Sequence, residues 1–251
     1  MMTSDEERFL ERFERFLIDE IAPDAAAMDR DGSALTSGFE RFKREHGLLL
    51  QMPVAQGGRL LSPPAFAVFR MQLARYAGAL SFLQAQHQVA VSWLARASDP
   101  TSVQAVFDEI RTEGLALGSG FLSPRHQAFD ITLQGDTYIV SGEIPWVTGF
   151  GFLQQIVTAF EHDGARHFCR LPFQSCQQGG GAITYTDAMP LIVFDALNTV
   201  RATLTRWTVP REHVFLSLSG SAHAERERHN SVYTLAGACQ ALRDLVGELE
   251  H

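Results

Sequence analysis

Two histidines and two cysteines have side chains that can bind a metal ion: His162, His167, Cys169 and Cys176. Imidazole and thiolate groups are the usual ligands of zinc, and such sites normally contain a tightly spaced ligand pair such as C-x-x-C or H-E-x-x-H. These four residues lack such a pair, and three of them fall in or beside stretches with alternating β patterns. We therefore predict that they are hairpin and strand residues and that the chain has no metal site.

Other residues that could do chemistry have a simpler structural interpretation. Gly179-Gly180-Gly181 precedes a strand pattern and does not open a helix, so it predicts a flexible turn rather than a phosphate-binding loop. His87 stands in an apolar helical run, which favours a core histidine with its hydrogen bonds satisfied over an acid–base catalyst. No G-x-S-x-G or comparable nucleophile context is present.

Composition excludes several classes of partner. The 251 residues include 21 basic and 29 acidic side chains, for a net charge of −8, and no Lys/Arg-rich run, so nucleic acid is not expected to bind. The apolar stretches are too short for membrane insertion. The acidic, amphipathic first residues are unlike a secretory leader, and three cysteines are an odd and sparse set. We predict a soluble, cytoplasmic protein with reduced thiols.

The elements that must position a site are helical in the first third of the chain. Ser4 and Glu7 have the spacing of a capping box, and an apolar face with helical periodicity follows up to Ile21. A short helix is predicted at 39–46, ended by Gly47 in the left-handed conformation. Further helices are predicted at about 62–76, 79–97 and 99–113.

The pattern then changes to strands. Residues 129–133 and 137–141 alternate around Gly135-Asp136, which predicts a hairpin. Residues 156–160 and 167–171 predict a second hairpin, and 199–209 form a long β-branched run. Helical periodicity returns at 222–249.

This order of elements predicts an α+β fold. It consists of an N-terminal helical bundle domain at 1–114, an antiparallel β-sandwich or barrel domain at 115–218, and a short C-terminal helix at 219–251.

One hairpin carries a family resemblance. Residues 135–149 read GDTYIVSGEIPWVTG, which is similar to the run GDxYxxxGxKxWxTG in the middle domain of acyl-CoA dehydrogenases. The Gly47-Leu48 to Gly57-Gly58 stretch, the 191–214 segment and Leu235-Ala236-Gly237 also resemble family segments in order and spacing. The resemblance covers nearly the whole chain and implies that 219–251 is what remains of a truncated second helical domain.

The resemblance implies a flavin site with FAD as cofactor. In this family a tryptophan at the position of Trp146 flanks the flavin ring, and a threonine at the position of Thr148 hydrogen-bonds its reactive nitrogen. A broad aromatic face suits a flat heterocycle, and a hydroxyl can donate or accept a hydrogen bond. Without the surrounding motif, the same two residues would be ordinary strand residues.

The phosphate-binding loop departs from the family pattern. The family run TEPxAGSD is matched here by LSPRHQ at 122–127, so Leu122 and Ser123 occupy the positions of the usual Thr and Glu. The matching positions assign Leu122 and Ser123 to the cofactor site, but the Gly-Ser turn is missing. Arg125 either contacts a phosphate or is a solvated loop arginine.

The catalytic base of the family is also missing. Aligning Leu235-Ala236-Gly237 places Ser231 at one of the two positions where the family carries its catalytic glutamate, and a serine cannot be that base unaided. Glu225 and Glu227 belong to a self-paired, solvated charge run. No catalytic residue is assigned.

Two functions from different classes follow. The first is FAD-dependent oxidation of the CH–CH bond of an acyl-CoA or acyl-carrier thioester, with a partner chain completing the site. The second is a non-catalytic relative that acts as a binding or subunit-interaction protein. The apolar face of 235–249 predicts a homodimer or a hetero-oligomer.

Overall fold

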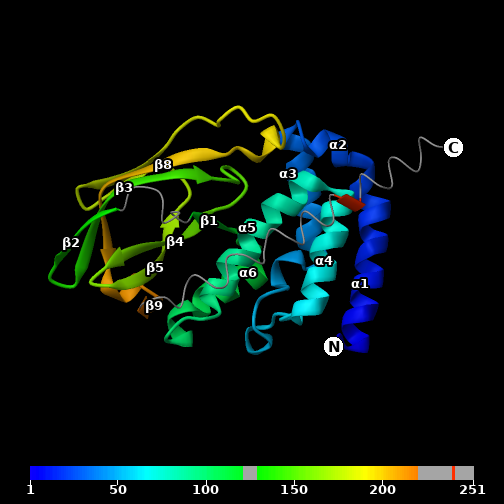
Figure 1. The fold of residues 1–251 in the computed structure, drawn as a ribbon, viewed down its shortest axis with the longest axis horizontal. Helices are drawn as coiled ribbons and strands as arrows, with labels where there is room; N and C mark the ends of the chain where they lie inside the picture. The colour runs from blue at the N-terminus through cyan, green and yellow to red at the C-terminus, as the bar shows by residue number, and fades with distance from the viewer. Residues whose placement is uncertain (121–128, 220–238, 241–251) are drawn as a thin grey trace.

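The structure, a computed structural model, describes residues 1–120, 129–219 and 239–240. Helices form the first part of the chain and two β-sheets follow (Figure 1), with helix α5 (Gly78–Leu94) packed against strand β1 (Leu117–Gly120). The predicted α+β class, with helices first and largely antiparallel sheets second, is confirmed.

Helix α1 (Ser4–Phe16) begins one residue earlier than the sequence predicts. The capping box consists of Thr3 and Glu6, not Ser4 and Glu7: the Thr3 hydroxyl accepts from the Glu6 N–H, and the Glu6 carboxylate accepts from the Thr3 N–H at 2.8 Å. The second oxygen of Glu6 accepts from the Ser62 N–H at 2.7 Å. This long-range bond fixes which of the two hydroxyl residues becomes the cap.

Helix α3 (Gly32–Arg44) is longer than predicted because Asp31 caps it, accepting from the Ser33 N–H at 2.8 Å. The left-handed residue after it is His46, with φ 58°, so the prediction for Gly47 is wrong. Gly47 is required for a steric reason, since a Cβ there would lie 2.3 Å from the Phe42 ring. Close approach of an aromatic side chain, and not backbone handedness, requires this glycine.

The remaining helices confirm the predicted pattern, with ends shifted by a few residues. Phe13, Phe42 and Phe69 meet in the helical core, where the ring centroids of Phe13 and Phe69 are 5.0 Å apart. The elements in chain order are η1 (Leu17–Ile21), η2 (Ala22–Asp24), α2 (Ala25–Met28), η3 (Gly47–Leu49), η4 (Val54–Gln56), α4 (Pro63–Tyr76), η5 (Pro100–Val103) and α6 (Gln104–Glu113).

The strands form two sheets. The first has the order β1-β4-β5-β9, in which β1 and β4 are parallel and the other pairs antiparallel. The second has the order β2-β3-β8-β7-β6 and is antiparallel throughout. The bounds are β1 (Leu117–Gly120), β2 (Asp130–Gln134), β3 (Thr137–Val147), β4 (Gln155–His162), β5 (Ala165–Pro172), β6 (Cys176–Gln178), β7 (Gly181–Tyr185), β8 (Val200–Pro210) and β9 (Leu216–Ser219), with η6 (Asp195–Leu197) and η7 (Arg211–His213) between them.

Both predicted hairpins are confirmed, and a third is present. Strands β2 and β3 join at Gly135, with φ 57°, and β4 and β5 join through Asp163 and Gly164, with φ 50° and 71°. Gly179 and Gly180 connect β6 to β7 with φ 56° and 81°, so the glycine run is the turn that the sequence predicts. Paired positive φ values are typical of the two-residue turns that match strand twist.

His87 links the helices to the first strand. Its ring is fully buried, its Nε2 lies 2.9 Å from the carbonyl oxygen of Leu48, and its Nδ1 accepts from the Leu117 N–H at 3.0 Å. Burial lowers the pKa of His87 to about 4. The prediction of a satisfied core histidine is confirmed.

One sequence prediction falls almost wholly beyond these residues. The C-terminal helix at 222–249 lies outside the described residues except for Cys239 and Gln240, which are helical. The domain limits stay predictions, with the change from helix to strand lying between α6 and β1. Within the described ranges no helix is long and apolar enough to cross a membrane.

Candidate functional site

A β-bulge in β3 turns Trp146 outward. Ile144 pairs with Ala202 and Val147 with Val200, so β3 takes one residue more than β8 over this interval. Pro145, next to Trp146 in the bulge, has no N–H to give to the ladder, and bulges tolerate that loss. Ile144 and Val147 are both fully buried, whereas Trp146 is 63% exposed. The bulge therefore presents an indole face on the outer side of the second sheet.

Thr148 is the other residue that the sequence assigns to the flavin ring, and the structure gives it a partner. Its Oγ1 lies 3.0 Å from Oγ1 of Thr199, and either hydroxyl can be the donor. Thr148 is 9% exposed and Thr199 is 6% exposed. The structure thus places Trp146 and Thr148 two residues apart at the end of β3, one open to solvent and the other largely covered.

The backbone after Thr148 is tied to the segment that precedes β8. The Gly149 N–H donates to the Leu197 carbonyl at 2.9 Å, and the Asn198 side chain donates to the Phe150 carbonyl at 3.2 Å. Gly149 has φ 99°, and a Cβ there would lie 2.5 Å from the Leu153 side chain. Only glycine fits this turn, which holds Thr148 beside Thr199.

Charged side chains also lie on β3 and β8 close to Trp146. Glu143 and Arg201 flank buried inward-facing residues of their strands, and their charged groups are 3.9 Å apart. Both side chains are about half exposed, so the ion pair contributes little to stability. The sequence analysis missed Thr199, Glu143 and Arg201. Extending the predicted strand at 137–141 through the motif to 148, and pairing it with the run at 199–209, would have found them.

Several residues assigned from the sequence fall outside the described residues. These are the loop positions Leu122, Ser123, Pro124 and Arg125, and the candidates for the base position, Glu225, Glu227 and Ser231. The assignment of Leu122 and Ser123 to the cofactor site therefore stays a prediction.

The histidines and cysteines considered as metal ligands are strand and hairpin residues, as predicted. His167 on β5 has its Nδ1 2.9 Å from the Ser217 hydroxyl, while Cys169 is buried and Cys176 lies in the other sheet. Burial raises the pKa of the Cys169 thiol to about 12. Over the part of the chain that the structure describes, no group of three His, Cys, Asp or Glu side chains could hold a metal ion.

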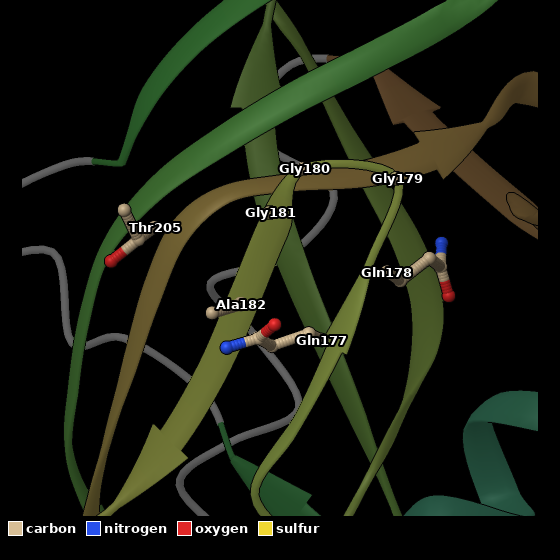
Figure 2. Close-up of a pocket in the computed structure, with 7 residues that line it drawn as sticks. All are labelled: Gln177, Gln178, Gly179, Gly180, Gly181, Ala182 and Thr205. Atoms are coloured by element: carbon tan, nitrogen blue, oxygen red, sulfur yellow. The ribbon is translucent and has the colours of Figure 1, made fainter.

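Two hollows lie away from Trp146. The first, of about 380 Å³, lies on the second sheet where Gln177, Ala182 and Thr205 form a row across three strands (Figure 2). The glycine turn at 179–181 also lines this hollow. The second, of about 280 Å³, lies between η5, β5 and η7, where the guanidinium of Arg170 donates to the Gln155 side chain at 2.6 Å. Burial lowers the pKa of Arg170.

Comparison with known proteins finds a family match in the helical part of the chain. Residues 3–109 match the model of the acyl-CoA dehydrogenase N-terminal domain. No curated protein matches the chain.

Solved structures match over almost all of the chain. A nitrososynthase from Micromonospora carbonacea var. africana is 17% identical with a TM-score of 0.77, covering 98% of this chain and 66% of its own. KijD3 in complex with FMN and dTDP-3-amino-2,3,6-trideoxy-4-keto-3-methyl-D-glucose is 19% identical with a TM-score of 0.76, covering 99% and 65%. An acyl-CoA dehydrogenase from Geobacillus kaustophilus is 15% identical with a TM-score of 0.67, covering 96% and 63%.

The chain thus spans just under two thirds of the length of these structures. At such identities the likeness shows a shared fold.

Proposed function

Because the chain is a relative of the acyl-CoA dehydrogenase family, we propose that it is a flavin-binding oxidoreductase with FAD as cofactor. The ring of the flavin lies against Trp146, and Thr148 hydrogen-bonds its reactive nitrogen. The observation that carries the proposal is the bulge in β3, which leaves Trp146 63% exposed between two buried residues.

The chemistry of these two side chains fits the group. An exposed indole is the side chain that a flat heterocycle covers with the largest gain of buried apolar area. A threonine hydroxyl can donate or accept, and the buried Thr148 hydroxyl, just beyond the end of β3, is hydrogen-bonded to Thr199, just before the start of β8. Bound FAD supplies the hydride-accepting chemistry, while the protein binds and orients it.

The substrate proposed first is an acyl thioester, either acyl-CoA or an acyl group on a carrier protein, oxidised at its CH–CH bond. Among proteins of the same fold, one solved structure is a glutaryl-CoA dehydrogenase with glutaryl-CoA and another is a prolyl acyl carrier protein oxidase. The base that removes the α proton would come from a partner chain or a second subunit, in a homodimer or hetero-oligomer.

A non-catalytic binding or subunit-interaction protein is the second candidate. The observation in its favour is that Thr148 is only 9% exposed and already hydrogen-bonded to Thr199. A protein that had lost its flavin could retain this pair as an ordinary cross-strand contact.

The proposed compartment is the cytoplasm. Cys169, Cys176 and Cys239 are free thiols, and a reducing environment keeps such thiols unpaired.

The test is the absorbance spectrum of the full chain after incubation with FAD, and separately with FMN, followed by removal of free flavin. We expect a protein-bound flavin spectrum with FAD that an acyl-CoA bleaches under anaerobic conditions. Retention of flavin without bleaching by acyl-CoA or acyl-carrier thioesters would contradict oxidation of these substrates by a homodimer of this chain and leave a different partner chain as the source of the base. Recovery of colourless protein with both flavins would overturn the flavin site and leave the second candidate.

A further inference from the structure

Thr199 lies opposite Thr148 at the point where the ladder between β3 and β8 ends. Val147 pairs with Val200, so Thr148 and Thr199 are the next cross-strand pair, and their hydroxyl oxygens are 3.0 Å apart. Both residues are more than nine-tenths buried. Since the proposed function gives Thr148 the contact to the flavin, an inference about its partner rests on that proposal.

Two hydroxyl groups carry two hydrogens, and only one of these can lie between the two oxygens. Each hydroxyl donates one hydrogen bond and accepts up to two. When Thr199 donates to Thr148, the Thr148 hydrogen is free to point at a ligand. When Thr148 donates to Thr199, the lone pairs of Thr148 are free to accept. The pair therefore has two arrangements, one presenting a donor and the other an acceptor.

A flavin requires these two arrangements in turn. Its reactive nitrogen bears a lone pair when the ring is oxidised and a hydrogen when two electrons and a proton have been taken up. Thr148 must donate in the first case and accept in the second. In the second case its own hydrogen needs an acceptor in a buried place, and Thr199 supplies the oxygen.

We infer that Thr199 is a positioning residue that keeps Thr148 hydrogen-bonded in both redox states of the bound flavin. If Thr199 lost its hydroxyl while the flavin was oxidised, the Thr148 oxygen would lose one hydrogen-bond donor. The Thr148 hydroxyl would still donate its own hydrogen bond to the flavin. The reduced state would leave the buried Thr148 hydrogen without an acceptor, which costs more. Loss of Thr199 therefore weakens the binding of reduced flavin more than that of oxidised flavin.

The experiment measures the midpoint potential of the flavin on the full chain, reduced stepwise with dithionite against a reference dye. We expect Thr199→Val to weaken reduced relative to oxidised flavin by about fivefold, the factor that corresponds to about 1 kcal/mol for one hydrogen bond. A fivefold weaker binding of reduced relative to oxidised flavin lowers the two-electron midpoint potential of the bound flavin by about 20 mV. Thr199→Ser, which keeps the hydroxyl, restores the wild-type potential.

A double-mutant cycle separates this role from a general effect of the substitution. In a Thr148→Val background, Thr199→Val should leave the potential unchanged, because Thr148 then has no hydroxyl hydrogen for Thr199 to accept. If Thr199→Val unfolds the protein, Thr199→Ala and Thr199→Cys are compared in the same way. Bound flavin with equal potentials in wild type and Thr199→Val would overturn the inference and leave the flavin site standing. Failure of the wild type to take up flavin would overturn both.

Discussion

The imidazole Nδ1 of His87 accepts the backbone N–H of Leu117 at 3.0 Å, and this bond crosses the junction between helix α5 and strand β1. An amide N–H can only donate, so Nδ1 must be unprotonated and the ring hydrogen must lie on Nε2. Nε2 then donates to the Leu48 carbonyl oxygen, which lies 2.9 Å from it. The junction therefore requires neutral His87 in a single tautomer.

Stability should fall in acid because of this requirement. Burial lowers the pKa of His87 from 6.5 to about 4 in the folded protein. The unfolded chain binds the proton first, so the contribution is complete above about pH 6.5 and is lost as the pH falls toward 4. The free energy of unfolding should drop by up to about 3 kcal/mol over this window.

Urea unfolding at pH 7.5, 5.5 and 4.5 measures this slope. His87→Gln should lower stability at pH 7.5 and flatten the slope, whereas His213→Gln at an exposed position should leave the slope unchanged. A His87→Gln protein with the wild-type slope would contradict the account.

Glu6 makes a second pH-dependent contribution. Hydrogen bonds from the backbone of Thr3 and then of Ser62 lower the pKa of Glu6 to about 2. A depressed carboxyl pKa contributes stability above the unfolded value of about 4.5 and loses it as the pH falls toward 2.

Glu6→Gln should therefore cost about 1 kcal/mol at neutral pH, the usual size of a capping interaction, and almost nothing at pH 2. Glu7→Gln is the matched control, because Glu7 belongs to the alternative capping box and is exposed. Thermal unfolding of both variants decides between the two boxes, and equal losses would contradict the observed cap.

Gly149→Ala should disturb the turn that holds Thr148. The backbone has φ 99°, and the added Cβ would lie 2.5 Å from the Leu153 side chain. Strain and overlap together should cost about 2–4 kcal/mol.

Gly180→Ala separates the two causes, because Gly180 also has a positive φ, 81°, but has nothing within 4 Å of an added Cβ. It should cost about 1 kcal/mol, the strain alone. Denaturant unfolding gives the loss in free energy of unfolding for each variant. Equal losses would show that the Leu153 side chain moves away from the added Cβ.

Cys169 should not react with thiol reagents in the folded protein. It is buried, and burial raises its pKa to about 12, so almost no thiolate forms at neutral pH. Cys239 is exposed and should be modified first. Mass spectrometry after brief treatment with a maleimide locates the label, with urea-unfolded protein as the control in which all three cysteines react. Early labelling of Cys169 would contradict its burial.

Local signals account for what the sequence could predict. The turn at Gly135-Asp136 and the alternation on either side define the first hairpin, because both strands and their turn lie within one short segment. The bond between Glu6 and Ser62 joins residues 56 positions apart, and no local pattern chooses Thr3 over Ser4 without it.

The same limit applies to the site. Trp146 and Thr148 could be named from a contiguous motif, whereas Thr199 lies 51 residues beyond Thr148 and becomes its neighbour only when β3 pairs with β8. The outward turn of Trp146 depends on the bulge opposite β8, and strict alternation from Ile144 would have placed the indole inside.

The affinity of the chain for FAD, compared between wild type, Trp146→Ala and Val54→Ala, tests the central claim most directly. Val54 is 66% exposed in the helical part, so its truncation controls for the loss of an exposed apolar side chain. We predict that Trp146→Ala weakens FAD binding by about tenfold or more, as expected for the loss of an aromatic contact, and that Val54→Ala binds as the wild type does. Equal affinities of wild type and Trp146→Ala in equilibrium dialysis, or no binding by either, would contradict the flavin site at β3.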